Sequence, residues 1–155
     1  MRLWASLYAM VWIVFLEIWL GFTPIAPPVP YYAHILLGGV IVALAYTNFR
    51  ALRRLTVPGR IKRIAKAITS LSVLMVVLGA LLVFDVGSTW SLGFGLTIES
   101  GLRFLHFVNA MAIVTQASAI AIAYDMWEDR EFLTETRPDE VPAAIPAPAG
   151  PIGGA

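Results

Sequence analysis

Two histidines and one carboxylate are the residues of this chain whose chemistry stands out from their apolar surroundings. His34 and His106 are the only histidines among 155 residues, and Glu17 is the only charged residue between positions 3 and 22. Imidazole nitrogens bind transition metals, and a carboxylate can orient an imidazole, relay a proton or complete a metal site. An ionised side chain inside a membrane costs about 2.5–3.5 kcal/mol on insertion scales, so we expect these residues to serve a site.

The apolar segments that carry these residues predict a membrane protein. The chain is 59% hydrophobic and 14% charged, with a mean hydropathy of +0.77, whereas a soluble domain is about 45–50% apolar and about 25% charged. A spanning helix needs about 20 apolar residues. Four segments meet this requirement, at residues 3–22, 31–49, 65–84 and 102–124. We therefore expect an all-α, four-helix transmembrane bundle over residues 1–130, followed by a disordered Pro-, Ala- and Gly-rich tail at 131–155.

The basic residues predict how the bundle is oriented. Seven of the eleven Lys and Arg residues lie between Arg50 and Lys66, in the connection between the second and third segments. Short basic connections stay on the cytoplasmic side, which predicts an up-down-up-down, multi-pass protein of the cell membrane with both termini in the cytoplasm. The connections at 23–30 and 85–101 then lie outside. The basic connection is expected to face the cytoplasm or anionic lipid, and nucleic acid is not an expected partner.

This orientation places both histidines at matching depth. His34 and His106 each lie roughly 5–6 Å below the outer end of their segments, and Glu17 roughly 7–8 Å, at 1.5 Å per residue. The second and fourth helices of such a bundle face each other diagonally. Two imidazoles at one level can ligate a haem iron from opposite sides, and a chain without cysteine cannot hold an iron–sulfur cluster or a covalently attached haem. The sequence therefore predicts a b-type haem with His34 and His106 as axial metal ligands.

Other residues near the histidines are candidates for the same site. Gly38, one turn below His34, leaves room for a porphyrin edge, and Arg103 is placed to pair with a haem propionate. Asn109 is either part of the site or a hydrogen-bond link between helices. Glu17 is either a catalytic or proton-relaying residue or a side chain that reaches toward the interface. A non-haem metal held by both histidines and Glu17, and a quinone site, are the alternatives to haem.

The layout of residues 3–125 resembles one half of haem A synthase, with one histidine in the outer part of the second helix and another in the outer part of the fourth. That family has a Glu-x-x-His-Arg motif at the second helix, where this chain has Tyr31-Tyr-Ala-His34-Ile35. Four-helix membrane b-type cytochromes have a similar layout. The resemblance implies either electron transfer with a quinol or a respiratory complex, or an enzyme that modifies haem itself, with Glu17 in proton or oxygen chemistry. A third hypothesis is a cofactor-free accessory subunit or assembly factor, in which the histidines only pack.

Overall fold

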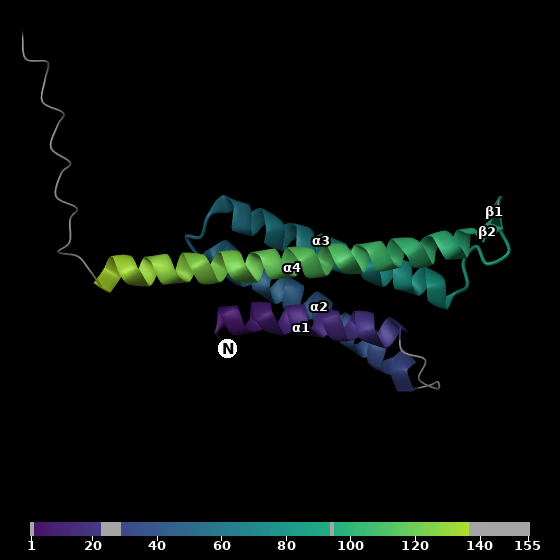
Figure 1. The fold of residues 1–155 in the computed structure, drawn as a ribbon, viewed down its shortest axis with the longest axis horizontal. Helices are drawn as coiled ribbons and strands as arrows, with labels where there is room; N and C mark the ends of the chain where they lie inside the picture. Colours follow the sequence, from purple (N-terminus) through teal and green to yellow (C-terminus); the bar gives the residue numbers. More distant parts are fainter. Residues whose placement is uncertain (1, 23–28, 94, 137–155) are drawn as a thin grey trace, which may run out of the picture.

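Four long α-helices make up the computed structural model, which describes residues 2–22, 29–93 and 95–136, with the backbone alone at 29–30, 92 and 131–136. The helices are α1 (Leu3–Phe22), α2 (Val29–Arg54), α3 (Gly59–Val83) and α4 (Ile98–Thr136), and a short antiparallel hairpin of β1 (Ser91–Gly93) and β2 (Leu96–Thr97) lies between α3 and α4 (Figure 1). Each helix is long and apolar enough to cross a membrane. The prediction of a fold of four apolar, membrane-length helices is confirmed.

The helix α1 has the predicted bounds, whereas the other three helices are longer than predicted. Helices α2 and α3 continue into the basic connection and leave only residues 55–58 between them, because Arg and Lys are good helix formers. Helix α4 continues through Thr136, so the first part of the predicted tail is helical. Residues 137–155 of that tail and residues 23–28 of the proline-rich connection lie outside the described residues.

The four helices form a ring in which each packs against two neighbours. Helix α1 packs on α2 and α4, and α3 packs on the same two helices, so α2 and α4 lie diagonally across the bundle. Contacts between α1 and α2 run in opposite order along the two helices. Ser6 pairs with Asn48 near one end, and Glu17 meets His34 near the other, which makes these two helices antiparallel.

The buried apolar core occupies one end of this bundle. Among the described residues, every buried apolar side chain except Leu78 belongs to a single cluster. The cluster draws on residues 7–14, 41–52, 57–68 and 113–124, which we call the packed end. The other end, which we call the open end, comprises residues 15–22, 31–40, 73–83 and 98–108. Exposed apolar side chains occur along the whole length of the bundle, as contact with lipid allows. Buried apolar side chains occur almost only at the packed end.

The connection at the open end depends on a glycine. Gly87 has a positive φ of 77°, and a Cβ built on it would lie 2.6 Å from side-chain atoms of Ile98, so a larger residue is excluded on both grounds. Gly87 O also accepts a hydrogen bond from the backbone of Trp90. The chain therefore turns tightly after α3 and enters α4 at Ile98, four residues before the predicted start of the fourth span.

Candidate functional site

The carboxylate of Glu17 meets the imidazole of His34 where α1 crosses α2. Oε2 of Glu17 lies 2.6 Å from Nδ1 of His34, and Glu17 is only 8% exposed. Among the described residues, no acceptor lies in line with the Nδ1–H bond of His34. The carboxylate and the imidazole are therefore in close contact without an aligned hydrogen bond. A small turn of the ring would convert it into a charge-assisted hydrogen bond. The residue that was out of place in the sequence of α1 thus has a partner on α2.

His106 reaches the same level from α4, on the diagonal. The ring centroids of His34 and His106 are 6.1 Å apart, and the ring planes are inclined by 54°. Gly79 of α3 lies against the second ring, since a Cβ built on Gly79 would be 3.4 Å from Cε1 of His106. Each of the four helices therefore contributes one residue to a polar level at the open end. We call Glu17, His34, Gly79 and His106 the His–Glu layer.

Besides Nδ1 of His34, which contacts Glu17 without an aligned hydrogen bond, two buried polar atoms of this layer have no hydrogen-bond partner among the described residues, namely Oε1 of Glu17 and Nδ1 of His106. Leaving a buried donor or acceptor unpaired costs about 1–3 kcal/mol. Such atoms persist where a site uses them or where the surrounding fold outweighs the cost. One is an acceptor on a carboxylate and the other an imidazole nitrogen, so the layer can bind a polar group or a metal-containing ligand.

The spacing of the two rings fits a pair of axial ligands. A metal–imidazole bond is about 2.0–2.1 Å long, so two such ligands on opposite sides of one ion have nitrogens about 4 Å apart and ring centroids about 6–6.5 Å apart. The observed 6.1 Å lies in this range. The contact of Glu17 with Nδ1 of His34 leaves Nε2 as the nitrogen that would bind a metal, as in other sites where a carboxylate orients a metal-bound histidine. The two imidazoles would be close enough to hold one iron.

A three-ligand, non-haem metal centre has no support in the geometry. In residues 2–22, 29–93 and 95–136, no three His, Cys, Asp or Glu side chains are arranged to hold one metal ion. Glu17 is directed to the Nδ1 side of His34 rather than sharing an ion with it. The geometry therefore favours a role in which Glu17 orients His34 over one in which Glu17 and both histidines bind the same metal ion.

The structure brings Gly38 to the side of α2 that carries His34 but places Arg103 elsewhere. Gly38 lies one helical turn from His34, and a Cβ built on it would meet nothing within 4 Å, so no neighbouring helix contacts this position. Arg103 is exposed and pairs through Nε with Oε1 of Glu99 at 2.9 Å. Glu99 lies in the first turn of α4, within the range 85–101 that was predicted to be a connection. Arg103 would have to leave this ion pair to reach a propionate.

Asn109 links two helices. Its Nδ2 donates to the backbone carbonyl of Leu71 at 2.9 Å, which joins α4 to α3, and the side chain is buried. This contact is the one expected if Asn109 acts as a hydrogen-bond link between helices. The sequence reasoning also missed Gly79, whose isolated position in an apolar helix was the available signal for a close approach.

Comparisons with known proteins add no family to this picture. No protein-family model matches the chain. The searches of curated proteins and of solved structures also gave no match.

Proposed function

We propose that this chain is a multi-pass membrane protein that holds a b-type haem between His34 and His106 and transfers electrons between a quinol and a respiratory complex. The observation that carries the proposal is the meeting of the only two histidines of the chain, from diagonal helices, with ring centroids 6.1 Å apart. With both termini in the cytoplasm, as the basic connection predicts, the site lies near the outer surface of the cell membrane.

Each residue of the His–Glu layer has its own role in holding the cofactor. Haem iron, when bound, supplies reversible one-electron chemistry whose potential depends on the axial ligands and their hydrogen bonds. His34 and His106 would hold the iron through their imidazole nitrogens. Glu17 fixes the ring orientation of His34 and increases the basicity of that ligand. Nδ1 of His106 has no such partner within the described chain, so the two ligands are unequal in strength.

The sparse packing of the open end supports a flat apolar ligand at this level. Leu78 is the one apolar side chain that is buried there among the described residues, and Gly79 removes bulk beside the imidazole of His106. A cofactor with a large apolar surface would provide the inward-facing contacts that the side chains themselves do not make. Helices in lipid associate through packing and hydrogen bonds, so such contacts add directly to bundle stability.

Absorption spectroscopy of the purified protein tests the proposal. The full chain, expressed in haem-replete cells and purified in detergent, should show a Soret band and the sharp reduced bands of six-coordinate haem. His34→Ala and His106→Ala should each lose this spectrum. Thr47→Ala on α2 and Thr115→Ala on α4 are matched controls, because each threonine is exposed and bonds only to its own helix.

Two results would contradict the proposal. A colourless wild-type protein, still colourless after incubation with haemin, would leave the hypothesis of a cofactor-free subunit whose histidines only pack. A Soret spectrum that survives both histidine substitutions unchanged would place any haem elsewhere.

A further inference from the structure

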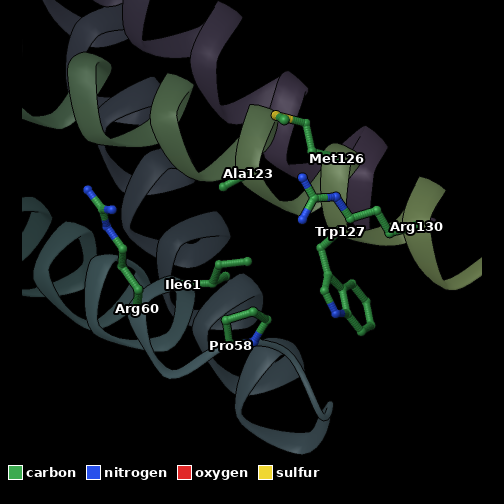
Figure 2. Close-up of a pocket in the computed structure, with 7 residues that line it drawn as sticks. All are labelled: Pro58, Arg60, Ile61, Ala123, Met126, Trp127 and Arg130. Atoms are coloured by element: carbon green, nitrogen blue, oxygen red, sulfur yellow. The ribbon is translucent and has the colours of Figure 1, made fainter. Parts of the chain in front are cut away.

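A pocket of about 290 Å³ lies at the packed end, between the start of α3 and the last turns of α4 (Figure 2). It is far along the bundle from the His–Glu layer and is independent of the function proposed above. Most of its lining is apolar. The lining residues are Pro58, Arg60, Ile61, Ala123, Met126, Trp127 and Arg130.

The charge of this pocket is entirely basic. Arg60 and Arg130, both exposed, approach it from α3 and α4, and Figure 2 shows the Arg130 side chain folded back over the space beside Ala123. None of the described residues that line the pocket is acidic. Glu128, near Arg130 in sequence, lines a different pocket beside Arg2. The pocket is therefore suited to an anion that also carries apolar surface.

The position of the pocket matches the end of the membrane-length segments. Helix α3 begins at Gly59, and the apolar stretch of α4 gives way to a charged run at residues 125–130. Trp127 is partly buried at this level, and tryptophan favours the boundary between lipid chains and headgroups. The basic connection from Arg50 to Lys66 also reaches this boundary.

Two other arginines of the basic connection are engaged differently. The guanidinium of Arg50 lies 5.9 Å from the ring centroid of Tyr46, and that of Arg53 lies 5.6 Å from the ring centroid of Phe49, each on its own helix. Neither lines the pocket. Arg60 thus differs from its neighbours in bordering an apolar cavity.

We propose that this pocket binds an anionic phospholipid. The phosphodiester accepts hydrogen bonds from Arg60 and Arg130, while the first acyl carbons lie against Ile61 and Ala123. A volume of about 290 Å³ is at the lower limit of ligand pockets, which are about 300–1,000 Å³. It accommodates a headgroup and the start of the chains, and the rest of each chain lies along the bundle in the bilayer. Basic pockets between membrane helices bind anionic headgroups in this way.

Quenching of tryptophan fluorescence by brominated lipids tests the proposal in the full chain. The protein is placed in nanodiscs of phosphatidylcholine with increasing fractions of phosphatidylglycerol brominated near the top of its chains, or of brominated phosphatidylcholine. The component of the emission that Trp127→Phe removes should be quenched at a lower fraction of the anionic lipid than of the neutral one. Replacing Arg60 or Arg130 by Gln should raise the required fraction about fivefold for each arginine. The two effects should combine in the double variant Arg60→Gln/Arg130→Gln.

The matched control has the same net charge as the variant in which both Arg60 and Arg130 are replaced. Arg53→Gln/Arg54→Gln removes two positive charges from the same basic connection without touching the pocket, and it should preserve the preference for the anionic lipid. Circular dichroism checks that the variants remain helical.

Three outcomes would overturn the proposal. Equal quenching by the two brominated lipids would mean that the pocket does not select charge. Equal effects of the two double variants would mean that a diffuse basic field attracts the lipid. Displacement of the lipid by glycerol phosphate at equal concentration would mean that the pocket recognises the free phosphate and not a lipid.

Discussion

The packed end and the open end are built from the same four helices, yet they differ in what faces the interior. At the packed end most inward positions are apolar and enclosed, as for Leu7, Leu52 and Ile120, each 0% exposed, and the buried polar side chains Ser6 and Asn48 share a hydrogen bond. At the open end the inward positions are a carboxylate, two imidazoles and a glycine. The helices remain equally apolar toward lipid, so hydropathy does not distinguish the ends. The difference indicates that one end stabilises the bundle and the other end is available for binding, since functional regions are drawn from the less stable parts of a fold.

Truncating a core side chain at the packed end should have the largest effect on stability. Leu52→Ala removes a fully buried side chain and should lower the free energy of unfolding by about 2–5 kcal/mol. Leu36→Ala at the open end removes a side chain that is 69% exposed and should change it by less than about 0.5 kcal/mol. Unfolding of the full chain in mixed micelles with increasing dodecyl sulfate, followed by circular dichroism, measures both. Equal losses for the two leucines would break the distinction between the ends.

This division could be predicted from the sequence only in part. The number of helices followed from hydropathy, because four apolar segments of spanning length are separated by charges, prolines and glycines. The bounds of α2 and α3 did not, because Arg and Lys at the ends of an apolar segment lower its hydropathy while favouring helix. Which end would hold the core was also hidden, since Leu36 and Leu52 are alike in type and lie on one helix with different exposure.

Neutralising Glu17 should have the next largest effect, and at the open end alone. Glu17→Gln keeps the shape of the side chain but removes its charge, so it should weaken haem binding about 10–100-fold, as loss of such an orienting partner does elsewhere. The reduction potential should rise, because the carboxylate makes His34 a more basic ligand that favours ferric iron. A tenfold change in relative affinity for the two oxidation states corresponds to about 59 mV for one electron.

Haem titration and spectroelectrochemistry measure these two effects. Asp125→Asn is the matched control, because it also removes one negative charge but lies far from the His–Glu layer, where Asp125 accepts a hydrogen bond from Tyr8. Identical affinities and potentials for wild type and Glu17→Gln would show that the contact with His34 has no influence on the ligand.

The meeting of the two histidines was easier to predict from the sequence than the pairing of the charged residues around them. The meeting of His34 and His106 was predicted from their depth and from the diagonal placement of α2 and α4, and the structure brings the rings together. The pairing of Glu17 with His34 was not predicted as such, since the rotation of α1 about its axis is set by its packing on α2 and α4. The pairing of Arg103 with Glu99 could have been read from the sequence, because residues four apart on a helix are neighbours.

Removing the interhelical amide should have the smallest effect and should resolve the two roles considered for Asn109. Asn109→Ala deletes the hydrogen bond to the carbonyl of Leu71, and single hydrogen bonds between membrane helices contribute about 0.6 kcal/mol on average. The dodecyl sulfate midpoint should fall slightly, while the haem spectrum and affinity stay at wild-type values. Asn109 lies between the two ends, at the boundary of the buried cluster, so a link there holds α3 and α4 together without touching the imidazoles. A loss of haem affinity larger than the loss of stability would instead assign Asn109 to the site and extend the open end by one further turn of α4.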